Sequence, residues 1–450
     1  MGTTLLNAVD GQKPREIAAD VLNRCKTESL HPGPVPAHGY RFVEDLLDAS
    51  LSRAQLSSAD RRLCQELVYG VVRWRAALDW LIGRKIQRKN PKQHLQNLLR
   101  LGLYQIFWLE RIPNHAAVHE TVQLVKRAGL HSQAGLVNAV LRGYLREFQA
   151  TCQLLTEIKT SQPHIGFSHP QWLVERWRER WDIQRTVQLM QWNNTPPKSI
   201  ARVNLLKIEP GKLLAQWRDE NIEYNFVRRD WFEENLVFEI RSKRSFRDLP
   251  SFQQGLFYLQ DPSTLLAVHL LDPHPGESVL DMCAAPGGKL SFIAQLMKNE
   301  GKLVAHDTAP DRLKLIAENC SRLGIICDIS ATLPRSSSSG QKFHKVLVDA
   351  PCSNTGVIRR RVELRWRIRA EELARLRSLQ LELLRQAADL LLPQGALVYS
   401  TCSLEPEENS SVVTQFLRER NEFKLETERE LLPFVNEVDG AYVAVLKAGQ

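Results

Sequence analysis

The sequence predicts a protein of several domains, with an all-α amino-terminal part, a small α+β part and a carboxyl-terminal α/β part built on a mostly parallel sheet. The chain has 450 residues, more than the ~100–200 that one domain usually holds. Apolar residues recur at helical spacing as far as about Leu145, whereas beyond about Gln253 short apolar strands alternate with amphipathic helices. We therefore expect domains at residues 12–150, 163–250 and 251–450.

The charge balance points to an acidic partner. Charged residues make up 25% and hydrophobic residues 43% of the chain, as in an ordinary water-soluble protein. The formal net charge is +9 and the isoelectric point is near 9.1. This surplus favours a polyanion, with nucleic acid as the first candidate, although an ordinary basic protein fits the composition too.

The cysteines predict neither a metal site nor a disulfide framework. The 8 cysteines are scattered and contain no Cys-x-x-Cys pair, which fits a reducing compartment. They are Cys25, Cys64, Cys152, Cys283, Cys320, Cys327, Cys352 and Cys402.

No targeting or membrane segment is expected. Residues 1–30 lack the basic start and apolar core of a signal peptide, and no run of ~18 uncharged apolar residues occurs. The sequence therefore predicts a cytoplasmic protein with no membrane partner.

Residues 14–145 are predicted to form a helical bundle. Leu67, Val68 and Val71 recur at helical spacing, and Asn90-Pro91 marks a helix boundary. The basic run at residues 84–89 is either a solvated helix face or a nucleic-acid contact, and by itself it decides nothing.

The middle of the chain predicts a small α+β module. Helical periodicity lapses over residues 152–170 and returns over residues 170–192, where four tryptophans lie among arginines. Such aromatics can stack on bases, but packing in a small core is the favoured interpretation. Strand-like runs follow at residues 199–204 and 236–240, with a helical stretch between them, and basic residues 241–244 close the module.

The carboxyl-terminal part predicts a parallel sheet with crossover helices. Strands are expected at residues 278–282, 302–305, 345–348, 396–399 and 441–446. Helices are expected at residues 290–297, 311–323, 371–392 and 407–419. The serine-rich residues 336–340 are interpreted as a surface loop, and no internal repeat occurs.

A glycine-rich loop follows the first of these strands. It consists of Cys283, Ala284, Ala285, Pro286, Gly287, Gly288 and Lys289. A doubly wound sheet exposes backbone N–H groups to a ligand at this position, and glycine lets the ligand approach closely. The spacing is neither that of a Walker loop nor Gly-x-Gly-x-x-Gly, so we expect a cofactor site of another kind rather than a plain turn.

Three further candidates lie at predicted strand ends. Asp307 ends the second strand, where such sheets bind ribose hydroxyls, although a helix cap is the alternative role. Cys352 and Cys402 each follow a later strand. Two thiols at successive strand ends indicate a thiolate that attacks a base and a second thiol that helps release it, rather than two inert buried cysteines.

These segments resemble the RNA cytosine-C5 methyltransferase (NOL/Nop/Sun) family. The matching blocks are residues 281–289, 349–360, 400–409 and 439–440 with the final strand. The helical amino-terminal part resembles the NusB-like module of the family's bacterial small-subunit rRNA branch. The likeness spans nearly the whole chain and is weakest in the middle.

The resemblance implies a Rossmann-like domain that binds S-adenosylmethionine as the methyl donor. The loop of residues 283–289, together with Asp307 and Asp349, would hold this cofactor. Asp349 would contact the cofactor edge or the base, and Lys289 would orient its carboxylate. Most family members carry an acidic residue past the third strand, whereas this chain has Ser330, with Asp328 two residues earlier.

The resemblance also implies the roles of the two thiols. Cytosine C5 is too weak a nucleophile to take a methyl group directly, so a thiolate must first add to C6. By resemblance Cys402 is this nucleophile, Cys352 assists elimination, and Asp349 favours addition at the N3 side of the base. Cytosine-C5 methyltransferases acting on DNA use the Pro-Cys thiol, here Cys352, but the block at residues 400–409 counts against that assignment.

The implied substrate is one cytidine of 16S rRNA or of a small ribosomal subunit precursor, and a monomer is expected. Two other functions stay open: a non-catalytic RNA-binding assembly factor, and C5 methylation of another RNA such as tRNA. Arginines at positions 359–361, 365, 367 and 369 surround Trp366, and we expect them to bind phosphates or a splayed nucleotide.

Overall fold

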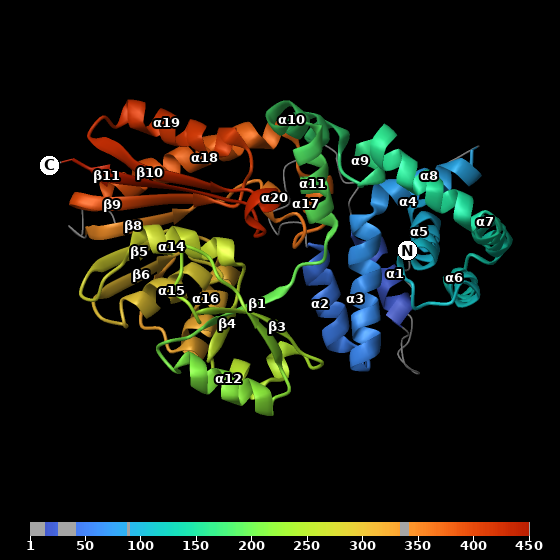
Figure 1. Ribbon diagram of the computed structural model, residues 1–450, viewed down its shortest axis with the longest axis horizontal. Coiled ribbons are helices and arrows are strands. Elements are labelled where there is room, and N and C mark those ends of the chain that lie inside the picture. The colour runs from blue at the N-terminus through green and yellow to red at the C-terminus, as the bar shows by residue number, and fades with distance from the viewer. Residues whose placement is uncertain (1–13, 26–41, 88–90, 334–341, 450) are drawn as a thin grey trace, which may run out of the picture. The chain divides into compact units, whose positions relative to one another are not determined.

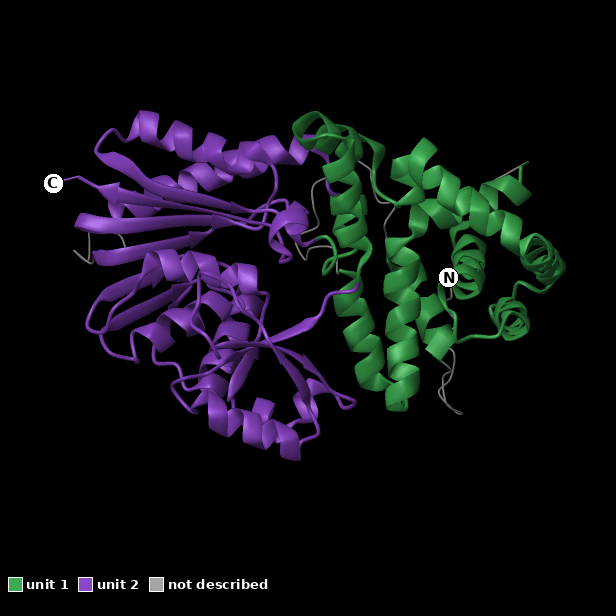
Figure 2. Cartoon of the chain, in the orientation of Figure 1, with its two compact units in different colours: residues 1–195, 358–367 green, residues 196–357, 368–450 purple. Residues whose placement is uncertain are grey.

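The computed structural model describes residues 14–25, 42–87, 91–333 and 342–449, divided between two units (Figure 2). The first unit comprises Met1–Thr195 and Ile358–Arg367, and the second comprises Pro196–Val357 and Ile368–Gln450. The loop expected at residues 336–340, most of the region examined for a signal peptide, and positions 88 and 89 of the basic run lie outside the described residues.

The first unit is a helical bundle, as the apolar periodicity predicted. Its α-helices are α1 (Pro14–Arg24), α2 (Val43–Arg53), α3 (Ser58–Arg73), α4 (Arg75–Lys85), α5 (Gln93–Trp108), α6 (Asn114–Arg127), α7 (Ala134–Arg146), α8 (Phe148–Ser161), α9 (Pro163–Gly166), α10 (Gln171–Trp181), α11 (Ile183–Asn194) and α17 (Leu364–Arg367). Helix α5 is central, because almost every residue from Leu95 to Ile106 is buried. Helix α3 packs closely against it, since a Cβ on Gly70 would lie 2.0 Å from the ring of Tyr104.

The lapse of apolar periodicity over residues 152–170 does not mark a break in helical structure. Helices α8 and α9 cover most of that stretch. Helix α8 buries only Thr151 and Ile158, so its sequence shows no apolar stripe even though its backbone is helical.

The second unit begins with a small antiparallel sheet. Its strands are β1 (Ser199–Val203), β2 (Glu223–Phe226), β3 (Val237–Arg241) and β4 (Phe257–Leu259), in the order β2-β3-β1-β4. Helix α12 (Pro210–Asp219) lies between β1 and β2 in sequence, as predicted, and its buried Trp217 packs edge-on against Phe238 and Phe257 of the sheet.

The rest of the second unit is a seven-stranded sheet in the order β10-β11-β9-β8-β5-β6-β7. Its strands are β5 (Ser278–Asp281), β6 (Lys302–His306), β7 (Asp328–Ser330), β8 (Phe343–Asp349), β9 (Leu391–Thr401), β10 (Phe423–Leu431) and β11 (Ala441–Ala448). Strands β5 to β9 are parallel to one another, and β11 is antiparallel to both of its neighbours, β9 and β10. The five predicted strands are present, but the two edge strands were missed: β7 spans only three residues, and β10 is rich in exposed charged residues.

Helices cover both faces of this sheet (Figure 1). Helices α14 (Leu265–Leu271), α15 (Gly288–Leu296) and α16 (Pro310–Leu323) share a core with Val279, Leu347 and Val398. Helices α18 (Ala370–Asp389) and α19 (Ser410–Glu419) share the other core with Leu280 and Tyr399. The strands are therefore buried on both faces, which explains why they read as continuous apolar runs. Over the described ranges, no helix is long and apolar enough to cross a membrane.

Candidate active site

The carboxyl ends of four adjacent parallel strands bring the predicted site residues to one edge of the sheet. Strands β9, β8, β5 and β6 are neighbours and parallel in register. Asp307 and Cys402 directly follow β6 and β9, and Asp349 ends β8. This edge is where open α/β sheets bind their ligands.

The glycine loop after β5 makes a tight turn into α15. Gly287 has φ +100°, a left-handed conformation that favours glycine, and its N–H donates to the carbonyl of Ala284 at 2.7 Å. A Cβ on Gly288 would lie 3.0 Å from the ring of Tyr258. Helix α15 starts at Gly288, so the backbone N–H groups of its first turn are available to a ligand.

Asp307 lies against this loop, as predicted. Its side chain is buried, and its carboxylate accepts a hydrogen bond from Ala285 N at 3.4 Å and pairs with Arg312 at 3.2 Å. It also accepts from Ala309 N at 3.4 Å, but Ala309 is the N-cap of α16 and no side chain caps this helix, so Asp307 does not have the alternative role of a helix cap.

Asp281, at the end of β5, is a site residue that the sequence did not assign a role. It is 1% exposed, and its carboxylate oxygens lack a well-formed hydrogen bond with the described residues. Burial, and then the negative charge of Asp349, raises the pKa of Asp281 to about 7. The signal was present in the motif itself, because an aspartate at the end of an apolar strand, two residues before a cofactor loop, is a costly residue to bury.

Lys289 and Asp349 form an ion pair of 2.7 Å beside the loop, which is the contact the resemblance implied. Ser400 donates to the second oxygen of Asp349 at 2.7 Å. Although burial opposes it, the Asp349 carboxylate raises the pKa of Lys289, so the lysine is an ammonium ion at neutral pH. The carboxylate is thus held in one orientation by two donors.

The structure brings the two predicted cysteines together. The Sγ atoms of Cys352 and Cys402 are 3.3 Å apart. The hydrogen bond with Cys402, together with burial, raises the pKa of Cys352, so Cys352 is a neutral thiol at pH 7. Burial also raises the pKa of the Cys283 thiol, so this cysteine is neutral at pH 7 as well.

Asn354 is a third residue that contacts the thiol pair, and the sequence did not single it out. Its Oδ1 accepts from Cys402 Sγ at 3.1 Å, and its Nδ2 donates to the carbonyl of Cys352 at 2.6 Å. Its φ is +60°, a left-handed conformation that asparagine tolerates better than most residues. An asparagine two residues after the Pro-Cys cysteine was the only local signal.

The position that departs from the family pattern lies at the end of β7. Because β7 is parallel to β6 and Ser330 pairs with His306, Ser330 lies at the ligand-binding edge, and its carbonyl accepts from Asp307 N at 3.3 Å. Its hydroxyl donates to the carbonyl of Thr332. Asp328 starts the strand, is exposed, and therefore lies toward the opposite edge.

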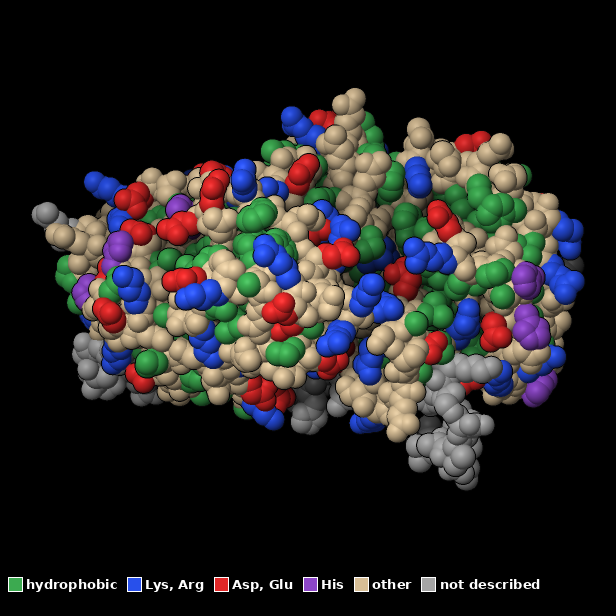
Figure 3. Space-filling view, turned by 60° about the horizontal axis from the view of Figure 1, so that its bottom comes forward, with side chains coloured by type: hydrophobic (Ala, Val, Ile, Leu, Met, Phe, Trp, Pro, Cys, Tyr) green, Lys and Arg blue, Asp and Glu red, His purple; other side chains and the backbone are tan. Residues whose placement is uncertain are grey.

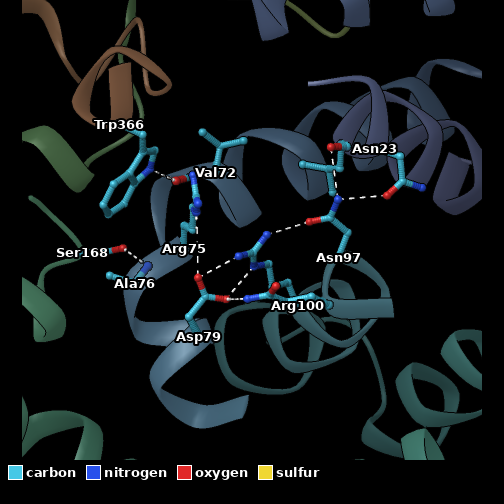
Figure 4. Close-up of polar contacts among 11 residues, drawn as sticks. Asn23, Val72, Arg75, Ala76, Asp79, Asn97, Arg100, Ser168 and Trp366 are labelled. Carbon is cyan, nitrogen blue, oxygen red and sulfur yellow. Dashed lines mark hydrogen bonds and ion pairs between the residues drawn. The ribbon is translucent and has the colours of Figure 1, made fainter. Parts of the chain in front are cut away.

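The prediction that the arginines around Trp366 bind nucleic acid is wrong for those that the first unit buries. Arg365 is fully buried and donates to the carbonyls of Ser168 and Asn193 at 3.1 and 2.9 Å. Trp366 Nε1 donates to the carbonyl of Val72 at 2.7 Å (Figure 4). The density of arginines in the sequence predicted an exposed basic surface, but Arg365 is buried with backbone carbonyls of the bundle as partners.

Other predicted contact groups have partners within the first unit. The guanidinium of Arg359 stacks on Trp192 at 3.9 Å, and Trp177 is buried, which confirms the core interpretation for that tryptophan. In the basic run, Lys85 pairs with Glu147 at 2.8 Å and Arg84 stacks on Trp80. On the face in Figure 3, Lys and Arg side chains lie interspersed with Asp and Glu rather than in one basic field.

Strand order, the loop at the end of β5 and the acidic residues at neighbouring strand ends define a Rossmann-like enzyme with a nucleotide-type cofactor site. Three family models match the chain. The model "16S rRNA methyltransferase RsmB/F" matches residues 268–447, the NusB family model matches residues 12–146, and the ferredoxin-like domain of RsmF/B-like methyltransferases matches residues 169–238.

Whole-chain comparisons agree with these models. A Bacillus subtilis protein named "Probable ribosomal RNA small subunit methyltransferase B" is 36% identical over 84% of this chain and 85% of its own. "Ribosomal RNA small subunit methyltransferase B" of Vibrio vulnificus is 35% identical over 90% and 96%. The crystal structure of PH0851, 24% identical, matches the fold with a TM-score of 0.76 over 98% of this chain and 100% of that one.

The chain therefore belongs to the RsmB/F family of methyltransferases. The predicted fold class is confirmed: a NusB-type helical domain, a ferredoxin-like α+β domain and a Rossmann-like methyltransferase domain. The exact domain boundaries expected from the sequence stay a proposal.

Proposed function

We propose that this protein transfers the methyl group of S-adenosylmethionine to C5 of a cytidine in 16S rRNA, through a transient bond between Cys402 Sγ and C6 of the base. The observation that carries the proposal is the thiol pair, 3.3 Å apart at adjacent strand ends beside the Lys289–Asp349 ion pair. The names of the relatives support small-subunit rRNA as the substrate.

The residues at the strand ends fit the proposed cofactor. The buried carboxylate of Asp281 and the buried amide of Gln260 lack well-formed partners, and a Cβ on Gly288 would lie 3.2 Å from Gln260 Oε1. A ligand with cationic and polar groups would satisfy them. S-adenosylmethionine has an ammonium and a sulfonium group, and it supplies an electrophilic methyl. Asp307 is the proposed partner of its ribose hydroxyls.

Cys402 is the proposed nucleophile. Cys352 has a raised pKa and rests as a neutral thiol, which disfavours Cys352 as the nucleophile. The positively charged Lys289 ammonium interacts electrostatically with Cys402. The Cys402 sulfur adds to C6, and the electron density this places on C5 lets that carbon accept the methyl group. The assignment of Cys352 as the nucleophile, as in enzymes that act on DNA, is the rival that the experiments below test.

Release of the product is the proposed role of Cys352. Once Cys402 is bound to C6 it no longer hydrogen-bonds to Cys352 as a thiol or thiolate, so the main cause of the raised pKa of Cys352 is removed. Cys352 then loses its thiol proton to solvent and, as a thiolate, takes the C5 proton. The C5–H electron pair forms the C5–C6 double bond, and the Cys402 sulfur leaves with the electron pair of its bond to C6.

The Lys289–Asp349–Ser400 group is proposed to orient the base. Its two donors occupy one lone pair on each Asp349 oxygen, which leaves the carboxylate aligned for the N3 side of cytosine or for the cofactor edge. The remaining lone pairs of this ion-paired carboxylate can only accept, so on the N3 side of cytosine they would receive hydrogen bonds from the exocyclic amino group.

The test uses tritiated S-adenosylmethionine and unmethylated small-subunit rRNA, with tRNA as a parallel substrate. We expect label in 5-methylcytidine of the rRNA, and a covalent protein–RNA complex on a denaturing gel when the target contains 5-fluorocytidine. Label in tRNA alone would show that tRNA, and not small-subunit rRNA, is the substrate. RNA binding with no label and no trapped complex would favour a non-catalytic assembly factor.

A further inference from the structure

A buried carboxylate outside the predicted site connects the two cysteine loops. Glu408 ends the 3-10 helix η5 (Pro406–Glu408) and is fully buried. Its Oε1 accepts from Ser353 N at 2.8 Å and from Gln380 Nε2 at 3.0 Å. Its Oε2 accepts from the hydroxyls of both Ser353 and Ser403, the latter at 2.5 Å.

The two serines are the residues that directly follow the two cysteines. Ser353 follows Cys352, Ser403 follows Cys402, and their hydroxyl oxygens are 3.0 Å apart. A single carboxylate oxygen therefore holds both loops at the point where each leaves its cysteine. A buried acceptor with four donors is rigid, because moving either loop would leave a polar group without a partner.

We propose that Glu408 is a positioning residue that sets the separation of the Cys352 and Cys402 thiols, and that it thereby governs release of the methylated base. This inference rests on the proposed function of the two thiols. Glu408 acts through Ser353 and Ser403, and its negative charge also contributes to the raised pKa of the Cys352 thiol.

The backbone explains why release is the step that depends on Glu408. Cys402 directly follows Thr401, which still pairs with Tyr442 in the sheet, so the ladder holds Cys402 in place. Cys352 lies three residues beyond the end of β8, and its position depends on loop contacts such as Ser353 with Glu408. Loosening these contacts therefore displaces Cys352 more than Cys402.

The test compares Glu408→Gln with the wild type in two assays. In this variant an amide nitrogen would replace one carboxylate oxygen and would face groups that need a hydrogen-bond acceptor. The hydrogen bonds between Glu408 and the two cysteine loops would therefore be lost without a large change in side-chain volume. We expect steady-state turnover to fall by at least about tenfold, the order of effect of small misplacements at reacting centres. The first methyl transfer should change much less, and a covalent RNA adduct should accumulate with ordinary cytidine, as in Cys352→Ala. The control Glu382→Gln alters an exposed glutamate of α18 that pairs with Arg385, and both assays should stay at wild-type values.

A purely structural role for Glu408 predicts another pattern. Loss of folded enzyme would lower the first transfer and turnover equally, with no adduct, and this outcome would overturn the inference. If Glu408→Gln does not fold, Ser403→Ala, which removes one of the hydrogen-bond donors to Glu408, provides the test. We expect a smaller fall in the ratio of steady-state turnover to the rate of the first methyl transfer. A ratio equal to that of the wild type would refute the inference. A wild-type enzyme that transfers no methyl group to cytidine would instead refute the proposed function.

Discussion

The two thiols at the sheet edge are close enough to act on the same base, as the proposed mechanism requires. Their sulfur atoms are 3.3 Å apart, and Asn354 contacts both cysteine residues. Only one of the two can be the nucleophile for a given base. The neutral resting state of Cys352 favours Cys402.

Substitution of each cysteine separates these roles. Cys402→Ala is expected to abolish methyl transfer and adduct formation, because no sulfur adds to C6. Cys352→Ala should still add and methylate but release slowly, so that a protein–RNA adduct appears on a denaturing gel. Cys320→Ala, away from this pair, serves as the control. An adduct with Cys402→Ala and none with Cys352→Ala would reverse the assignment.

Asp281 makes stability depend on pH in an unusual direction. Its folded pKa of about 7 lies above the unfolded value of about 3.9, so the folded protein keeps a proton that the unfolded chain releases. Between those two values a rise in pH therefore lowers stability, and the full penalty is present above pH 7.

Asp281→Asn removes this penalty because asparagine is neutral at every pH. We expect the variant's gain in unfolding free energy to grow by roughly 2 to 3 kcal/mol between pH 5 and pH 7 and then to level off. Urea denaturation at pH 5, 6, 7 and 8 measures it. Asp328→Asn, at an exposed position, should show no such growth. A gain that is the same at all four pH values would contradict the assignment.

At the scale of elements, the cofactor loop depends on a backbone conformation rather than on side chains. Gly287 has φ +100°, and a Cβ there would meet only Asn319 Cβ at 3.8 Å, so space is available but the conformation is strained for any other residue. Left-handed backbone costs a non-glycine residue about 1–2 kcal/mol.

Gly287→Ala is therefore expected to lower affinity for S-adenosylhomocysteine by about tenfold, as the loop either bears the strain or rearranges away from its binding shape. Isothermal titration calorimetry measures the change. Gly211→Ala in α12 is the matched control, because an added Cβ there meets nothing within 4 Å and its φ is not positive. Equal affinities for the two variants would show that the loop does not bind the cofactor.

On the scale of the whole molecule, the first unit is built from two separate stretches of chain. Residues 358–367 complete the helical bundle, although they follow directly after the Pro-Cys loop in sequence. Val362 and Trp366 pack in the bundle core. Glu363 is fully buried there and accepts from Val43 N at 2.7 Å, Cys25 Sγ at 3.0 Å and Arg367 Nε at 2.7 Å.

Glu363→Ala would leave the Val43 N–H and the Arg367 guanidinium without this acceptor. We expect a loss of about 3–5 kcal/mol of unfolding free energy, as for other broken buried ion pairs. Urea denaturation followed by tryptophan fluorescence reports it, since Trp366 lies in the same segment. Glu372→Ala breaks the exposed pair with Arg375 and should cost less than about 1 kcal/mol. Equal losses would show that the segment contributes little to the bundle.

Local patterns in the sequence determined the helical bundle, the five central strands, the glycine loop and the two cysteines at strand ends. They did so because a strand buried on both faces and a residue that directly follows it are visible in a short window of sequence. Tertiary structure alone decided that Arg365 is buried against backbone carbonyls, that residues 358–367 belong to the bundle, and that Glu408 joins the two cysteine loops. A residue's own pattern shows that it needs a partner, but the partner comes from a distant part of the chain and is known only once the chain has folded.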